Sequence, residues 1–235
     1  MNYHMKRSEV NWVIKETLNW WKESGVALPP WAFYSPEVWR REVDAGHVDI
    51  DKMIKRGQGL YLSNFPVSGV RMSPNFSHQG TLSITVEDTG LKFLYQRQNQ
   101  AMLLHKHLKK EETVSVIGNS TVGRLVVRLY RPNESDGSPN YGGEALVKVN
   151  NLPRTVNFKQ RVSLAPGESI TFPAGVWHHF YASADGVSLQ AVSSIHEGTP
   201  GDDDTFMNQT EKFIAIEPDV PPEYLLGNEL KLLVR

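Results

Sequence analysis

The stretch Leu103–Gly118, LLHKHLKKEETVSVIG, places two histidines one residue apart and two glutamates shortly after them. Residues i and i+2 of a β-strand project from the same face, so an extended backbone would point the imidazoles of His105 and His107 in one direction. A carboxylate from the beginning of the next strand could join them, and Glu111 and Glu112 are both within range. By itself, the stretch fits either a charged strand end or three ligands of a metal ion.

A second stretch far along the chain resolves part of this ambiguity. Pro166–Phe180, PGESITFPAGVWHHF, contains His178 and His179 directly after a Pro-x-Gly turn, at the beginning of another predicted strand. Three imidazoles and one carboxylate that converge would hold a divalent cation and leave coordination positions open for substrate oxygens. The chain contains no cysteine, so nitrogen and oxygen atoms must supply every ligand of such a cation.

The composition points to a globular protein with a small-molecule partner. Of the 235 residues, 40% are hydrophobic and 22% are charged, which is ordinary for a folded domain. A formal net charge of −1 gives no general attraction for nucleic acid or anionic lipid. The N-terminal residues lack the apolar run of a signal peptide, and no apolar stretch of 18 residues occurs. We therefore expect a cytoplasmic protein without a membrane or nucleic-acid partner.

Helical patterns occupy the first fifty residues. Between Ser8, a typical N-cap residue, and Gly25, the side chains suited to burial recur at helical spacing and predict a helix over Glu9–Glu23. The stretch Ser35–Gly46, SPEVWRREVDAG, predicts a second, shorter helix with proline in its first turn.

After Gly57 the pattern changes to short runs rich in β-branched and aromatic residues, separated by Gly, Asn, Asp and Pro. This texture predicts an antiparallel β-barrel or two-sheet sandwich behind the helical segment. Arg131–Gly143 has loop composition, and we expect a mobile surface loop there, or alternatively a lid at the mouth of a barrel.

The two histidine stretches resemble the motifs of the cupin superfamily. The spacing His105-x-His107-x4-Glu112, followed by a glycine, resembles the first cupin motif. The second motif is similar to Gly167-x5-Pro-x-Gly-x2-His178, with Ala182 where the motif ends in asparagine. This match selects His178 rather than its neighbour, which should face away from the metal because adjacent strand residues point in opposite directions.

Several blocks are similar to the cupin D-lyxose ketol-isomerases in particular. They are Met5–Trp39, His105–Gly118, Pro173–Ala182, VSSI at 192–195 and GNEL at 227–230. The resemblance implies a mainly β fold: a single cupin-type domain over 1–235, built as an antiparallel double-stranded jelly roll. In this reading, residues 1–50 form a helical segment packed on the barrel, and residues 57–235 form the barrel and a C-terminal tail.

The resemblance also implies roles for individual residues. The commoner cupin spacing would select Glu111 as the ligand, whereas in the isomerase family the ligand lies five residues after the second histidine, at Glu112. A lysine lies two residues before it, at Lys110. The implied metal is Mn²⁺, with Fe²⁺, Co²⁺ or Zn²⁺ as alternatives, bound by His105, His107, Glu112 and His178. Glu112 and Lys110 would be the catalytic, proton-handling pair, and Lys110 and Asp203 would contact the substrate.

The implied function is interconversion of an aldose and a ketose, of the D-lyxose/D-xylulose or D-mannose/D-fructose type, through an enediol intermediate. A homodimer is expected. Two alternatives stay open: another metal-dependent cupin enzyme, such as an oxidase, dioxygenase or decarboxylase, and a cupin that binds a sugar without converting it. The family usually has a glutamate before the VSSI block, whereas this chain has Gln190-Ala191, so the identity of the sugar is open.

Overall fold

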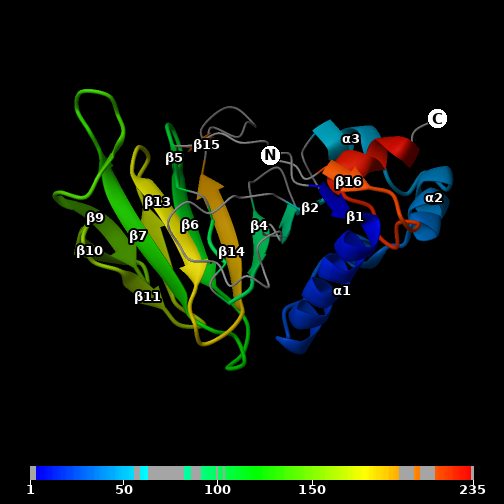
Figure 1. Cartoon of the computed structure of the whole chain (residues 1–235), viewed down its shortest axis with the longest axis horizontal. Coiled ribbons are helices and arrows are strands. Elements are labelled where there is room, and N and C mark those ends of the chain that lie inside the picture. Colours follow the sequence, from blue (N-terminus) through cyan, green and yellow to red (C-terminus); the bar gives the residue numbers. More distant parts are fainter. Residues whose placement is uncertain are drawn as a thin grey trace.

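Two curled antiparallel sheets make up most of the protein, and helices lie to one side of them (Figure 1). The computed structural model describes residues 4–55, 59–62, 82–85, 91–98, 100–102, 104–195, 204–206 and 215–233. The prediction of a mainly β fold of antiparallel sheets with an N-terminal helical segment is confirmed.

The larger sheet has eight strands within the described residues, in the order β10-β9-β12-β6-β14-β4-β3-β2. Its strands are β2 (Gly59–Leu62), β3 (Leu82–Thr85), β4 (Lys92–Gln96), β6 (Glu111–Val116), β9 (Glu144–Val149), β10 (Leu152–Asn157), β12 (Ser169–Phe172) and β14 (Ser188–Ile195). The second sheet has the order β11-β7-β13-β5-β15, with β8 attached to β7. Its strands are β5 (His105–His107), β7 (Leu125–Pro132), β8 (Pro139–Asn140), β11 (Val162–Leu164), β13 (Trp177–Ala182) and β15 (Asp204–Phe206).

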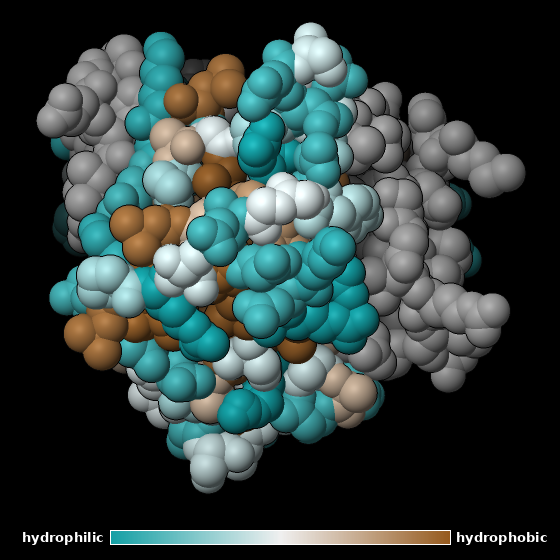
Figure 2. Space-filling view, turned by 90° about the vertical axis from the view of Figure 1, so that its left-hand side faces the viewer, coloured by the Kyte–Doolittle hydropathy of each residue, from teal (hydrophilic) through white to brown (hydrophobic). Residues whose placement is uncertain are grey.

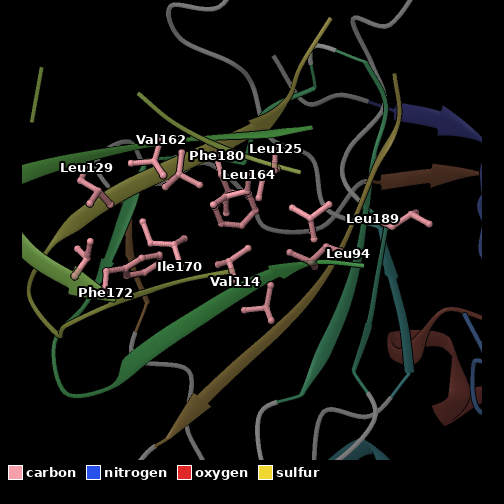
Figure 3. Close-up of a cluster of buried hydrophobic side chains, with 14 of the residues drawn as sticks. Leu94, Val114, Leu125, Leu129, Val162, Leu164, Ile170, Phe172, Phe180 and Leu189 are labelled. Atoms are coloured by element: carbon pink, nitrogen blue, oxygen red, sulfur yellow. The ribbon is translucent and has the colours of Figure 1, made fainter. Parts of the chain in front are cut away.

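The main hydrophobic core lies between these two sheets (Figure 3). Leu94, Val114 and Ile170 of the eight-stranded sheet face Leu129 and Phe180 of the other sheet. Buried and less buried residues alternate along β6 and β12, as expected for strands with one face toward a core. The inward face of β6 carries Val114 and Val116, and the same alternation makes Glu112 point inward.

The hairpin of β9 and β10 lies at the end of the sheet farthest from the helices (Figure 1). It turns through Asn150 and Asn151, both with positive φ, as a two-residue turn of type I′ requires. The molecular face at this end is mainly hydrophilic with separate apolar spots (Figure 2). Leu146 and Leu152 of the hairpin are both exposed.

The helical segment contains α1 (Arg7–Glu23), the 3₁₀ helix η1 (Pro30–Phe33), α2 (Pro36–Asp44) and α3 (Ile50–Lys55). Helix α1 begins two residues earlier than predicted. Ser8 does not cap it, because the Ser8 hydroxyl donates instead to Asp219 Oδ2 at 2.6 Å. At α2 the sequence prediction is confirmed, since the Ser35 hydroxyl accepts a hydrogen bond from Val38 N. The 3₁₀ helix η3 (Gly227–Leu233) lies near α3, and β1 (His4–Lys6) pairs with β16 (Ala215–Glu217).

Helix α1 is attached to the barrel through β4 and the residue after it. The ring of Trp21 meets Phe93 edge-on, with centroids 5.5 Å apart. Glu16 accepts a hydrogen bond from the Tyr95 hydroxyl at 3.0 Å and forms an ion pair with Arg97. These contacts combine apolar burial with polar pairs from two positions along the helix, so they fix the position of α1 on the sheet.

The stretch Arg131–Gly143 is more ordered than its composition predicted. Strand β8 lies within it and pairs with β7, and Asn133 N donates to Ser138 O at 2.7 Å. The carbonyl of Gly137 accepts hydrogen bonds from Lys106 and Trp177. The stretch is therefore a paired, hydrogen-bonded hairpin at the surface rather than a loop without regular structure. The contacted side chains neighbour the metal-ligand candidates in sequence and so point to the opposite face of the sheet, which does not support a lid over those candidates.

Two motif glycines provide a test of local packing. Gly118 has φ +109°, and a Cβ built there would lie 2.6 Å from Val122 Cγ2. Gly167 has φ +89°, but a Cβ there would meet nothing within 4 Å. Both alanine variants bear backbone strain of about 1–3 kcal/mol. We expect Gly118→Ala to lose about 1–3 kcal/mol more in unfolding free energy than Gly167→Ala, because of overpacking. Urea unfolding of both variants measures the difference, and equal losses would contradict it.

No helix within the described part of the chain combines the length and apolar character needed to cross a membrane.

Candidate metal centre

Strand β5 supplies two of the four clustered side chains. His105 and His107 are both buried, and their ring centroids lie 5.0 Å apart. One residue separates them in a strand, so they share a face, as the spacing predicted. A buried pair of imidazoles needs polar partners, and the neighbouring strands supply them.

His178 joins them from β13. Antiparallel pairing places it directly opposite His105, and the two Nε2 atoms lie 3.2 Å apart. His178 is fully buried, and its Nδ1 lies 3.0 Å from the Val176 carbonyl oxygen. A carbonyl only accepts, so Nδ1 donates to it, and Nε2 is the ring nitrogen that faces the cluster and is available to a cation.

Glu112 completes the cluster from the inward face of β6. Its Oε2 lies 2.9 Å from His107 Nε2, and its Oε1 lies 3.5 Å from His178 Nε2. Burial by itself raises the pKa of Glu112, but hydrogen bonding to His107 and His178 and their charges outweigh burial and hold that pKa well below its ordinary value. The carboxylate is therefore ionised at neutral pH.

The four side chains fit a single divalent cation. One ligand atom from each lies within 4.8 Å of all the others, and all four residues are buried. In octahedral coordination, ligands about 2.1 Å from a cation lie about 3 Å apart when adjacent. The His105–His178 separation of 3.2 Å and the separations of 2.9 and 3.5 Å from the two carboxylate oxygens of Glu112 to His107 and His178 are of this size. Three imidazole nitrogens and one carboxylate oxygen suit Mn²⁺, Fe²⁺, Co²⁺ or Zn²⁺.

The structure separates the two adjacent glutamates. Glu111 belongs to the outward face of β6, where its side chain is 44% exposed and its Oε1 lies 3.4 Å from Lys148 Nζ. The side chain of Glu112 is only 7% exposed. Geometry thus brings Glu112 to the histidines and leaves Glu111 at the surface.

Lys110 lies just before β6 and is 6% exposed, whereas the neighbouring Lys109 is exposed. Lys110 is therefore not a solvated surface charge. Burial of an ammonium group is unfavourable without specific polar surroundings, and Lys110 is buried two residues before Glu112 in the chain.

Two further sequence predictions concern neighbours of the cluster. Asp203 lies outside the described residues; the next residue, Asp204, begins β15 and pairs in register with His107. His179 contacts the rings of Tyr130 and Tyr181 and is not among the clustered side chains. Burial, followed by the positive charges of Arg128 and His178, lowers the pKa of His179 to about 4.

Sequence reasoning missed Phe172, whose ring centroid lies 4.1 Å from that of His178. Phe172 is buried and pairs with Glu112 across β12 and β6, so it forms an apolar wall beside two of the four ligands. Its position at the end of a strand with alternating burial was the available signal, but only the strand register places it beside Glu112.

Comparisons with known proteins agree over nearly the whole chain. A family model described as D-lyxose isomerase matches residues 5–230. The D-lyxose/D-mannose isomerase of Escherichia coli O157:H7 is 25% identical over 232 residues, which cover 97% of this chain and 99% of the relative. The D-lyxose/D-mannose isomerase of Serratia proteamaculans is 26% identical over 242 residues, covering 96% and 97%.

Among solved structures, the L-ribose isomerase of Cellulomonas parahominis aligns with a TM-score of 0.47 and 16% identity, over 92% of this chain and all of that one. A dTDP sugar isomerase from Desulfovibrio desulfuricans G20 aligns with a TM-score of 0.35 and 17% identity, over 65% and 83%. Because the family model extends from β1, past the four clustered side chains, into the 3₁₀ helix η3, the chain belongs to the D-lyxose isomerase family.

Proposed function

We propose that the protein interconverts D-lyxose with D-xylulose and D-mannose with D-fructose, with a divalent metal held by His105, His107, Glu112 and His178. Family membership makes the chain an aldose–ketose isomerase. The names of the curated relatives support D-lyxose and D-mannose as substrates. The observation that carries the proposal is the buried cluster, in which four ligand atoms lie within 4.8 Å of one another.

The reaction moves a proton between C1 and C2 of the sugar and relocates the carbonyl group. Negative charge develops on the two adjacent oxygens of the enediolate, so the site must stabilise charge there. A divalent cation, when bound, supplies Lewis-acid polarisation of these oxygens. The proton itself must be carried by side chains.

Glu112 and Lys110 are the side chains we propose for this task. Glu112 is ionised, because its pKa is held well below the ordinary value, so it can accept the proton from one carbon and return it to the other. Lys110 is buried two residues away and would donate a hydrogen bond to a substrate oxygen as its charge develops. Asp203 would bind a sugar hydroxyl, which is supported by the pairing of the next residue with ligand strand β5.

We further propose Mn²⁺ as the metal, and a single domain over 1–235 that is located in the cytoplasm. We propose a homodimer as the functional form. Trp12 and Phe33 of the helical segment are 52% and 45% exposed, and a partner subunit would bury such aromatic side chains. The chain contains no cysteine, so its fold does not depend on an oxidising compartment.

Metal removal and restoration test the proposed reaction. We expect the chelated protein to convert no sugar, and the protein restored with Mn²⁺ to convert D-lyxose or D-mannose to its ketose. The assay is proton NMR of D-lyxose, D-mannose and L-ribose, each with Mn²⁺, Fe²⁺, Co²⁺ and Zn²⁺ in turn.

If none of the three sugars were converted to its ketose with any of the four cations, the isomerase function would be contradicted. Oxygen consumption in place of isomerisation would identify an oxidase or dioxygenase. Tight sugar binding without turnover would identify a binding protein.

A further inference from the structure

One backbone carbonyl joins the two strands that carry the three histidines. The oxygen of Gly137 accepts a hydrogen bond from the indole Nε1 of Trp177 at 2.7 Å and from the ammonium Nζ of Lys106 at 3.3 Å. A carbonyl oxygen has two lone pairs and can accept both. The same ammonium lies 4.8 Å from the centroid of the Trp177 ring, which is cation–π geometry. We call this closed set of three contacts the Gly137 clamp.

The Gly137 clamp lies directly behind the metal-ligand candidates. Lys106 stands between His105 and His107 on β5, and Trp177 precedes His178 on β13. Successive side chains of a strand point to opposite faces, so the histidines face the cluster while Lys106 and Trp177 face the other way. Each ligand strand is thus attached to the same carbonyl by a residue adjacent to a ligand.

Regular backbone pairing between these two strands is limited. Strand β5 has three residues, and its register with β13 consists of one residue pair, His178 with His105, flanked by backbone hydrogen bonds from Gly175 N to His107 O at 2.7 Å and from Met102 N to Phe180 O at 2.8 Å. Three imidazoles must keep their relative positions for a cation to bind at normal ligand distances, so side-chain contacts that tie β5 to β13 have a direct effect on the ligand geometry.

Hydrogen bonds within the loop hold the segment that presents the carbonyl. Gly137 has φ +68°, and its N–H donates to Asn133 O at 2.9 Å. Asn133 Nδ2 donates to Ser138 Oγ at 2.6 Å, and Asp136 Oδ1 accepts from Ser138 N at 2.9 Å. Trp177 is only 4% exposed, so its indole N–H depends on Gly137 O rather than on bulk solvent for a partner.

We propose that Lys106 and Trp177 are positioning residues, which act through the Gly137 carbonyl to hold His105, His107 and His178 in metal-binding geometry. The inference rests on the proposed function, since it requires that the cluster binds a cation. It assigns a role in the metal site to the Arg131–Gly143 stretch, which touches the ligand strands from outside.

Three variants test the clamp. Trp177→Phe keeps an aromatic ring but removes the N–H donor, and Lys106→Met keeps an apolar stem but removes the charge and the donor. We expect each to weaken Co²⁺ affinity about tenfold, in the range found for residues that support metal-binding histidines. We also expect each to change the visible absorption spectrum of the bound Co²⁺. Lys106→Arg, which keeps both a cation and N–H donors, should restore affinity and spectrum to near those of the wild-type protein.

Tyr141→Leu is the matched control. Tyr141 belongs to the same loop and meets the Tyr130 ring at 4.9 Å, yet it makes no contact with the Gly137 carbonyl that the structure describes. It should lower thermal stability of the metal-free protein without changing the Co²⁺ spectrum. Because Lys106 and Trp177 act through one oxygen, Lys106→Met combined with Trp177→Phe should weaken affinity by less than the product of the single effects.

The clamp would be overturned if Lys106→Met and Trp177→Phe kept wild-type Co²⁺ affinity and spectrum, even with lowered thermal stability. The positioning role would also be overturned if the double variant weakened Co²⁺ affinity by the full product of the two single effects. If the wild-type protein bound no Co²⁺ at all, the proposed function would fail and the clamp with it, so the two failures are distinguishable.

Discussion

Glu112→Ala is expected to bind no metal and to lose isomerase turnover on the order of 10³-fold or more, whereas Glu111→Ala keeps both. The substitution removes one of four ligands and the proposed base together, and each of these contributes strongly to catalysis of proton transfer. The remaining histidines also lose the negative charge that faces His107 and His178. Metal content per chain, by elemental analysis, and turnover of D-lyxose, by NMR, measure the two effects.

Glu111 is a matched control because it is the adjacent residue, of the same chemical type, in the same strand. Its carboxylate meets Lys148 at the surface, and an exposed ion pair contributes little to stability. Circular dichroism should show that both variants are folded. Loss of metal from Glu111→Ala, with retention in Glu112→Ala, would reverse the ligand assignment.

Lys110→Met is expected to retain bound metal and to lose at least tenfold in turnover. A positioned general acid–base group contributes about 10²–10⁴-fold, and methionine matches the length of the lysine stem without the ammonium group. The loss should appear in kcat rather than in KM, because a charge on the substrate oxygen develops only as the reaction proceeds.

Lys109→Met is the control for this variant. It removes the same charge one residue away, at an exposed position, and should leave kcat within about twofold of the wild-type value, as expected for a surface substitution. Unchanged turnover in Lys110→Met would remove Lys110 from the mechanism. Loss of metal in Lys110→Met would instead give it a structural role at the cluster.

The short-range part of the site could be predicted from the sequence. The i and i+2 spacing of His105 and His107 sets their common face, because side chains of a strand alternate. The Pro-x-Gly turn before Val176 locates the start of β13 and thus His178. The alternation of side-chain direction predicted the buried residues correctly here, because each of these strands has one face toward a buried interior.

Long-range placement could not be predicted in the same way. Glu111 and Glu112 differ only in which face of β6 they occupy, and a shift of one residue in the strand would exchange them. The pairing register of β6 decides which glutamate faces the histidines. In this register Glu112 lies opposite Phe172 of β12 on one side and opposite Ser194 of β14 on the other. Ser8 failed as a predicted cap because Asp219, far away in sequence, competes for its hydroxyl.

The stretch Arg131–Gly143 illustrates the same limit. Its Asn, Asp, Ser, Pro and Gly content indicates turns, which the structure contains. Composition could not show that Gly137 O meets Lys106 and Trp177, because these partners come from strands 31 and 40 residues distant.

The sequence by itself determined the types of ligand, the strands that bear them and the mainly β architecture, since these follow from local spacing and from periodic burial. Only the tertiary structure decided which glutamate faces the histidines, that Lys110 is buried, and that one loop carbonyl supports both ligand strands from behind. The physical reason is that local patterns set the direction of a side chain relative to its own strand. Pairing between distant strands, selected by packing of the common core, sets which side chains meet.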